Sequence, residues 1–128
     1  MREIKFRMWN KKEKFMEELS YPFGIVDNEV WNISKNAILN NIILMQFTGL
    51  KDKNGKEIYE GDIVRWVVPE DVGESKREKR IIFWSKDSCG FYAKTLDSEY
   101  HCFINGVLFE IIGNIYENPE LLKRNKEW

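Results

Sequence analysis

The sequence predicts a mainly β fold, a small barrel or sandwich that ends in a short helix. Three observations indicate this class. Apolar and polar residues alternate in several segments, turn signals separate those segments at short intervals, and aromatic residues are plentiful, with five Trp, five Tyr and eight Phe. Alternation places apolar side chains on one face of a strand. Several short strands between tight turns are typical of small barrels and sandwiches.

The strands of the N-terminal half are predicted from this alternation. Residues 4–8 alternate strictly, so we expect a strand whose apolar face is buried and whose Lys5 and Arg7 point away from it. The apolar, β-rich segment 42–47 predicts a buried strand. Further strands are predicted over residues 14–19 and, as two short strands around Asp27-Asn28, within residues 24–33.

Turn signals divide the C-terminal half. Asn54-Gly55 is the strongest of them and predicts a type I′ turn with positive φ at both central residues. Gly49, Gly55 and Gly61 recur every six residues, which we interpret as consecutive tight turns. Strands are then predicted over residues 62–68, 79–85, 91–95, 99–104 and 107–115.

A short helix is predicted at the C-terminal end. Asn118 is a favourable N-cap and Pro119 fits the first helical position, because proline lacks the N–H that is unpaired there in any case. The helix is expected to continue to about Lys126, with Leu121 and Leu122 as its apolar contacts.

The composition sets limits on partners and location. Twenty basic and twenty-one acidic residues give a net charge of −1, which disfavours a dedicated duplex-binding protein, because phosphate neutralisation supplies most of the affinity of such proteins. The N-terminus carries charge throughout, and no apolar run approaches the about twenty residues of a membrane span. We therefore expect a cytoplasmic protein, with no membrane association and with both cysteines reduced.

The sequence names no catalytic residue, metal site or cofactor. His101 is the single histidine and precedes Cys102, but neighbouring residues of a strand point to opposite faces, so they are poorly placed to act as a nucleophile and its base. His101 with Cys89 would depend on the fold. These three residues fall short of a four-ligand structural zinc site. The segment 52–57 superficially resembles a calcium loop but lacks the distal Glu, and no phosphate-binding glycine motif occurs.

One basic cluster is a candidate nucleic-acid-binding site. It lies at the end of the connection formed by residues 69–80, and acidic residues of the same connection offset its charge. Aromatic rings beside cations can stack bases. The candidate residues are Lys76, Arg77, Lys79, Arg80, Trp66 and Trp84. The competing interpretation is a solvated hairpin tip, with both tryptophans in the core.

Three segments carry a family resemblance. They are Met1-Arg2-Glu3-Ile4-Lys5-Phe6-Arg7-Met8-Trp9, residues 44–64 around Tyr59-Glu60-Gly61-Asp62-Ile63-Val64, and residues 112–122 around Gly113-Asn114-Ile115-Tyr116-Glu117-Asn118-Pro119. Together they resemble the YopX family of phage and prophage proteins. The resemblance implies an irregular N-terminal β part over residues 1–50 and an SH3-like small barrel with the terminal helix over residues 51–128. It implies no catalytic residues, because the family's molecular function is undefined.

The central motif also has a physical interpretation of its own. Tyr59 to Val64 is a turn that leads into a strand, where Gly61 supplies backbone freedom and Asp62 can accept from nearby N–H groups. A folding signal is the favoured interpretation, and a binding role for Glu60 and Asp62 is the alternative.

Two functions are therefore carried forward. The first is a non-enzymatic binding or assembly protein of phage origin that acts as a homo-oligomer, with a phage or host protein as a further partner, because many short strands leave edges that invite another chain. The alternative is a nucleic-acid-binding accessory protein that uses the loop of residues 69–80.

Overall fold

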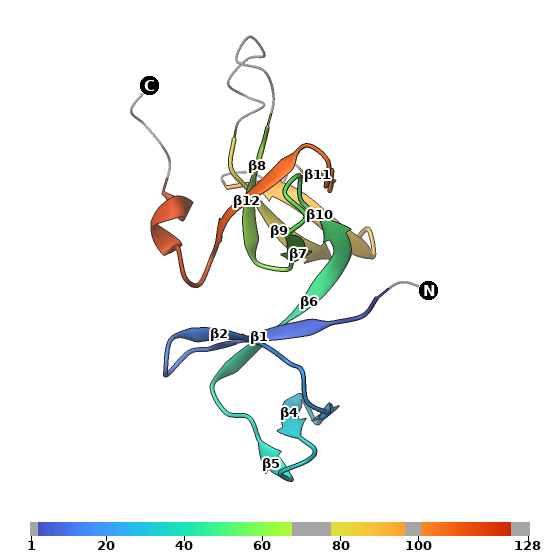
Figure 1. Ribbon diagram of the computed structural model, residues 1–128, viewed down its shortest axis with the longest axis vertical. Helices are drawn as coiled ribbons and strands as arrows, with labels where there is room; N and C mark the ends of the chain where they lie inside the picture. Colours follow the sequence, from blue (N-terminus) through green and yellow to red (C-terminus); the bar gives the residue numbers. More distant parts are fainter. Residues whose placement is uncertain (1–2, 68–77, 97–100, 124–128) are drawn as a thin grey trace.

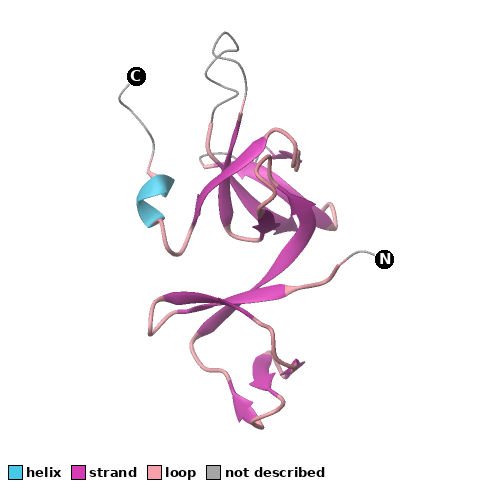
Figure 2. Cartoon of the chain, in the orientation of Figure 1, coloured by secondary structure: helices cyan, strands magenta, loops and turns pink. Residues whose placement is uncertain are grey.

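Antiparallel strands form almost all of the regular structure in the computed structural model, which describes residues 3–67, 78–96 and 101–123. The predicted mainly β class is confirmed. Three sheets follow one another along the long axis of the molecule (Figures 1 and 2). The strands are β1 (Phe6–Asn10), β2 (Phe15–Glu18), β3 (Phe23–Val26), β4 (Glu29–Asn32), β5 (Ala37–Ile38), β6 (Ile42–Lys51), β7 (Glu57–Tyr59), β8 (Asp62–Trp66), β9 (Arg80–Ser85), β10 (Gly90–Thr95), β11 (His101–Phe103) and β12 (Phe109–Asn114).

Strand β6 connects the two larger parts of the molecule. Its first half pairs with β1 and its second half with β7, in a four-stranded sheet of order β2-β1-β6-β7. The register shifts between Phe47 and Lys51, where Gly49 has a φ of +90°. Such a bulge bends a strand, and Figure 1 shows β6 rising from the lower sheet toward the upper part of the molecule. The predicted boundary after residue 50 falls inside this strand, and the two-part division stays a prediction.

The predicted alternation of the first strand is only partly correct. Arg7 was expected to point to solvent, yet its side chain is only 12% exposed, and Met8 and Trp9 are both buried. Both edges of β1 are paired, with β2 on one side and β6 on the other, and side chains from later in the chain cover it. A strand at a junction buries both of its faces, which the period-two pattern of residues 4–8 does not show.

The arm, as we call the three-stranded sheet β3-β4-β5, projects from the lower part of the molecule (Figure 1). Asp27 and Asn28 join its first two strands and both have positive φ, at 50° and 64°. This is the two-residue turn that hairpins favour. Its Phe23 packs edge-to-face on Phe6 of β1, with 5.4 Å between the ring centroids.

The upper part is a five-stranded sheet of order β11-β10-β9-β8-β12 that curls into a half-barrel. Its inner face carries the main core, formed by Val64, Ile82, Ala93 and Phe109 together with Ile58 of β7. Ile63 is also fully buried, but it points to the other face of β8. Trp66 packs edge-to-face on Phe109 at 4.8 Å. The SH3-like form of this part stays a prediction.

The predicted type I′ turn at Asn54-Gly55 is wrong. Gly55 has a φ of +80°, but Asn54 is not among the residues with positive φ. Instead, Asp52 organises the segment as a turn in which the Gly55 N–H donates to the Asp52 carbonyl oxygen at 3.0 Å. The side chain of Asp52 therefore overrides the Asn-Gly signal.

The predicted terminal helix is reduced, within the described residues, to the single 3₁₀ turn η2 (Pro119–Leu122). Its last predicted residues lie outside the described part of the chain. The side chain of Asn118 makes no capping hydrogen bond to this turn, although its backbone carbonyl oxygen accepts from the Leu121 N–H at 3.0 Å. Its Oδ1 accepts from the Asn114 N–H at 3.1 Å instead, so a tertiary contact takes the oxygen that a cap would use. Nothing in the described ranges is a helix long and apolar enough for a membrane crossing.

Candidate functional site

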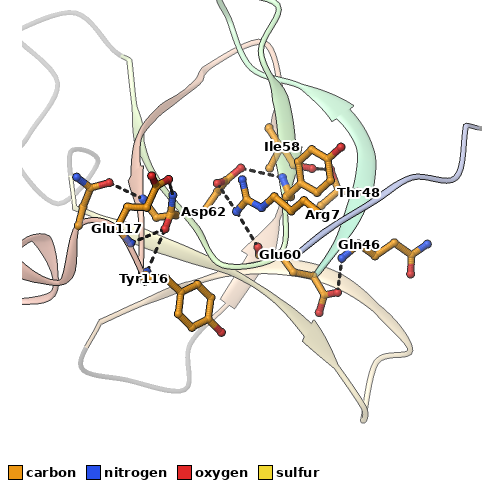
Figure 3. Close-up of polar contacts among 11 residues, drawn as sticks. Arg7, Gln46, Thr48, Ile58, Glu60, Asp62, Tyr116 and Glu117 are labelled. Atoms are coloured by element: carbon orange, nitrogen blue, oxygen red, sulfur yellow. Dashed lines mark hydrogen bonds and ion pairs between the residues drawn. The ribbon is translucent and has the colours of Figure 1, made fainter. Parts of the chain in front are cut away.

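The three segments that resemble the family meet in one place, at the junction of the lower sheet and the half-barrel (Figure 3). Arg7 and Trp9 come from β1, the turn of Glu60 and Gly61 precedes β8, and Asn114 ends β12. We call this group of residues the junction. Since it is the one place where all three segments converge, it is the candidate functional site.

A buried ion pair lies at its centre. Arg7 Nη2 donates to Asp62 Oδ1 at 2.8 Å and to the Glu60 carbonyl oxygen at 3.1 Å, and its guanidinium lies 4.7 Å from the centre of the Tyr59 ring. The Asp62 side chain is 3% exposed, and its Oδ2 accepts from the Tyr59 N–H at 2.8 Å. Burial raises the pKa of Asp62, while the charge of Arg7 and the Tyr59 N–H oppose that rise. Both carboxylate oxygens are thus used inside the protein.

Gly61 holds the turn between the two parts. Its N–H donates to the Ile82 carbonyl oxygen and its own carbonyl accepts from the Ile115 N–H, both at 2.9 Å. Its φ is +85°, and an added Cβ would lie 3.2 Å from Met45 Sδ and 3.4 Å from Tyr116 Cε2. Glycine is therefore required here by backbone conformation and by close approach together.

The Glu60 side chain extends the junction toward β6. Its Oε1 accepts from the Gln46 N–H at 2.8 Å, and its own N–H donates to the Gln46 carbonyl oxygen at 3.0 Å. Thr48 Oγ1 donates to the Ile58 carbonyl oxygen at 2.7 Å nearby (Figure 3). Burial raises the pKa of Glu60, while the Gln46 N–H and the charge of Arg7 act against the rise.

Asn114 closes the junction on the side of the half-barrel. Its Oδ1 accepts from the N–H groups of Tyr116 and Glu117 at 3.0 and 2.8 Å, and its Nδ2 donates to Glu117 Oε1 at 2.8 Å. The turn that results places the Tyr116 ring parallel to Trp9 of β1, with 5.9 Å between centroids. An amide side chain of this kind replaces backbone pairing in a tight turn.

These contacts stabilise the fold and do not form a reactive site. Arg7 Nη2 and the side-chain oxygens of Asp62 and Asn114 named above all have partners in the same chain. In the residues that the structure describes, no three His, Cys, Asp or Glu side chains gather as a metal site. The geometry agrees with the folding-signal interpretation of the central motif. The junction fastens the lower sheet to the half-barrel.

The family model described as YopX protein matches residues 5–123. This chain belongs to the YopX family. No curated protein matches it.

Two solved structures resemble this YopX-family chain. Protein EF1440 from Enterococcus faecalis is 30% identical with a TM-score of 0.64, over 96% of this chain and all (100%) of that one. Protein yopX from Bacillus subtilis is 19% identical with a TM-score of 0.54, over 93% of this chain and 98% of that one. The second likeness concerns the fold alone.

The residues proposed for nucleic-acid binding are dispersed in this YopX-family chain. Trp66 packs against the core, Arg80 is buried, and Lys79 Nζ donates to the Leu121 carbonyl oxygen at 3.3 Å. Trp84 is 47% exposed and meets Phe91 edge-to-face. Lys76 and Arg77 lie outside the described residues. Among the described members, the fold therefore presents only Trp84 as an exposed ring.

His101 and Cys102 point to opposite faces of β11, as their spacing predicts. The His101 ring contacts Tyr92 and Phe83 on the outer face, whereas Cys102 packs on the inner core. Both cysteines are free, and exposed Cys89 contacts the Lys86 carbonyl oxygen at 3.6 Å. The adjacent pair therefore does not form the thiol–imidazole contact that nucleophilic catalysis needs.

A hollow of about 230 Å³ lies where β1 begins, beside the end of β2. Its lining is mixed, and it is smaller than the roughly 300–1,000 Å³ of typical small-molecule sites. The residues that line it are Ile4, Lys5, Phe6, Glu18, Leu19, Ser20 and Phe23. It brings together no set of convergent catalytic groups.

Asp52 has a structural role that the sequence patterns did not indicate. Its Oδ1 accepts from the Asn54 and Lys56 N–H groups at 2.8 and 2.9 Å, and its Oδ2 from the Ile111 N–H at 3.0 Å. It thereby fastens the turn after β6 to β12. Burial alone would raise the pKa of Asp52, but these three N–H donors, with the charge of Lys56, outweigh it and hold the pKa below its ordinary value.

Replacing Asp52 by Asn is expected to lower the free energy of unfolding at pH 7 by about 1–3 kcal/mol, because one buried N–H then faces an NH₂ group. A lowered pKa stabilises the fold above pH 3.8, and that contribution is lost as pH falls through 3.8 and below. Urea unfolding of both proteins at several pH values should therefore show a difference that shrinks in acid. A difference that grows as pH falls would contradict this account.

Proposed function

We propose that this chain is a non-enzymatic binding or assembly protein of phage or prophage origin, which acts in the bacterial cytoplasm as a homo-oligomer. The phage origin rests on the family resemblance. The proposal of self-association rests on one observation, the exposed apolar face of the arm. We further infer that the half-barrel is an SH3-like small barrel.

The register of the arm defines this face. In β3, Val26 points to the face opposite Phe23 and Ile25. Trp31 of β4 pairs with Gly24, which shares the face of Val26, and Ile38 of β5 pairs with Trp31. The face opposite Phe23 therefore carries Val26, Trp31 and Ile38. The side chain of Ile33 lies over Gly24, with its Cδ1 3.5 Å from the position of a Cβ there. We call these four residues, Val26, Trp31, Ile33 and Ile38, the arm face.

The exposure of the arm face is unusual for an isolated chain. Val26 is 58%, Ile33 59% and Ile38 38% exposed. On the opposite face of the same sheet, Phe23 packs on Phe6, while Ile25 is 57% exposed. A small sheet needs a covered apolar face to be stable in water. Apolar side chains gathered on one exposed face mark an interaction site more often than scattered ones do.

A second copy is the partner that fits this face best. The described side chains on it are apolar apart from Glu29, which pairs with Val26 at the hairpin end. Two identical apolar faces can cover one another around a two-fold axis without any complementary charge. The arm would then be stabilised by assembly, because its apolar face would be covered.

The double substitution Val26→Lys with Ile33→Lys is expected to convert the oligomer to a monomer, since both positions face solvent within one chain and charge there opposes burial in a contact. Multi-angle light scattering at micromolar concentration measures the mass. The matched control is Phe103→Lys with Val107→Lys, at positions 78% and 79% exposed on the half-barrel, which should leave the oligomer intact. A monomeric wild-type protein would remove the proposal.

A second candidate, the nucleic-acid-binding accessory protein, is favoured by the outer face of the half-barrel. Tyr92 lies between His101 and Phe103, at 4.9 and 5.6 Å, and Lys94 Nζ lies 4.9 Å from the centre of the Phe83 ring. Rings and a cation on one sheet face can stack unpaired bases. This candidate requires that labelled single-stranded DNA bind with an affinity that falls as salt rises.

A further inference from the structure

Among the described residues, Arg7 and Arg80 are both largely withdrawn from solvent, and they differ in their surroundings. Arg7 has a carboxylate, a carbonyl oxygen and an aromatic ring as partners, although its Nε has none. Arg80 is 8% exposed, and both its Nε and its Nη1 are buried without a hydrogen-bond partner. Within the described ranges, no carboxylate forms an ion pair with Arg80.

A guanidinium with two buried nitrogens unpaired is costly, because those nitrogens lose their water and receive no hydrogen-bond partner in exchange. Arginine keeps its charge under all ordinary conditions, so it does not escape this cost by losing a proton. The position is therefore incomplete as it stands. An anion that enters from solvent would complete it.

The register shows where such an anion would sit. Arg80 pairs with Val64 of β8 and Thr95 of β10, and Ile82, two residues along the same strand, belongs to the core. Arg80 therefore lies on the inner face of the half-barrel. It is the first residue of β9 and Thr95 is the last of β10, so the guanidinium is at the end of that face rather than in its middle.

We propose that Arg80 is the anion-binding residue of an oxyanion site at this end of the half-barrel, and that the site takes a phosphate group. The planar guanidinium offers several N–H donors in fixed directions, which suits the oxygens of a phosphate. The phosphate comes either from a small phosphate ion or ester, or from a nucleic-acid backbone.

Thermal unfolding in increasing inorganic phosphate, against sodium chloride at matched ionic strength, tests the site. A ligand that binds the folded state alone raises the midpoint of unfolding. At saturating phosphate we expect the wild-type midpoint to rise by roughly 5–10 °C. A wild-type protein that responds to phosphate no more than to chloride would overturn the proposal.

Variants assign the response to Arg80. Arg80→Met should abolish it and should raise the midpoint in the absence of phosphate, because an apolar side chain of similar length replaces an unpaired charge. Arg80→Lys keeps the charge without the planar fork and should weaken the apparent affinity roughly tenfold. Arg65→Met, at a side chain 53% exposed, is the control that should respond like wild type. An unchanged response in Arg80→Lys overturns the proposal, even where Arg80→Met does not fold.

Two further measurements distinguish the possible occupants of the site. A short single-stranded oligonucleotide that reproduces the Arg80-dependent rise at lower concentration than inorganic phosphate identifies a nucleic-acid backbone as the source, and a rise with inorganic phosphate alone identifies a small phosphate. Asp97 and Glu99 lie outside the described residues. A double substitution Asp97→Asn with Glu99→Gln that creates a phosphate response absent from wild type would show that the chain's own carboxylate fills the site, and the proposal would fail.

Discussion

Replacing Arg7 by Met is expected to lower the free energy of unfolding by about 3–5 kcal/mol. The substitution leaves the Asp62 carboxylate, 3% exposed, without the cation that neutralises it, and removes the donor to the Glu60 carbonyl oxygen. Burial already raises the pKa of Asp62 while Arg7 is present. Without Arg7, the fold has to bury that charge alone or take up a proton. Urea unfolding monitored by circular dichroism measures the loss.

Two controls show whether charge is the cause. Arg65→Met breaks the exposed pair with Glu110 and should cost no more than about 1 kcal/mol. Adding Asp62→Asn to Arg7→Met should recover part of the loss, because the amide keeps an acceptor for the Tyr59 N–H and carries no charge. If the double variant is as unstable as the sum of the single ones, the two side chains do not act as a pair.

Replacing Phe109 by Ala is expected to cost about 3–5 kcal/mol, the usual range for removing a buried aromatic side chain. Phe109 has 0% exposure, and its ring packs against Trp66 in the half-barrel core. Both backbone polar groups of Phe109 are hydrogen-bonded. Its N–H donates to the Asn105 carbonyl oxygen, and its carbonyl oxygen accepts from the Lys53 N–H. The cavity would therefore open in a part of the chain that has little freedom to collapse.

The neighbouring residue gives a matched control for this prediction. Leu108 precedes Phe109 and is 39% exposed, so Leu108→Ala should change the free energy of unfolding by at most about 1 kcal/mol. Equilibrium unfolding in urea, with a common slope for the three proteins, gives the comparison. Equal losses at the two positions would mean that the core does not lie where the burial of Phe109 places it.

The junction and the Arg80 position assign opposite roles to two buried arginines. Arg7 is predicted to hold the fold together, so that its removal destabilises the protein under every condition. Arg80 is predicted to reduce stability until an anion binds, so that its removal helps in the absence of phosphate. The two Arg→Met variants should therefore shift the midpoint of unfolding in opposite directions in phosphate-free buffer. A common direction would show that both residues have the same structural role.

Several elements could be predicted because their signals are local. The turn of Asp27 and Asn28, with positive φ at both residues, follows from side chains that tolerate this conformation. Gly55 and Gly61 lie in turns with positive φ, as their spacing predicts, whereas Gly49 has a positive φ at the bulge inside β6, so the turn predicted there is wrong. The opposite directions of His101 and Cys102 follow from the geometry of any strand.

Two short strands could not be predicted in the same way, and neither could the reduction of the terminal helix to a 3₁₀ turn. Strand β5 has two residues and β7 three, so neither contains enough residues to show a period. Both exist because a neighbouring strand pairs with them. Asn118 carries a helix signal, but Asn114 takes its side-chain oxygen, and this competition involves the fold of the preceding turn.

The sequence by itself determined the β class, most of the strands and the family of this chain, because alternation, turn chemistry and long motifs are properties of neighbouring residues. Only the tertiary structure decided that Arg7 lies largely buried against Asp62, that Arg80 is on the inner face with its Nε and Nη1 unpaired among the described residues, and that the arm exposes Val26 and Ile33. Residues 7 and 62 are 55 positions apart. The fold decides which distant segments come together, and therefore whether a charged side chain is paired and whether an apolar face is covered. No local pattern contains that information.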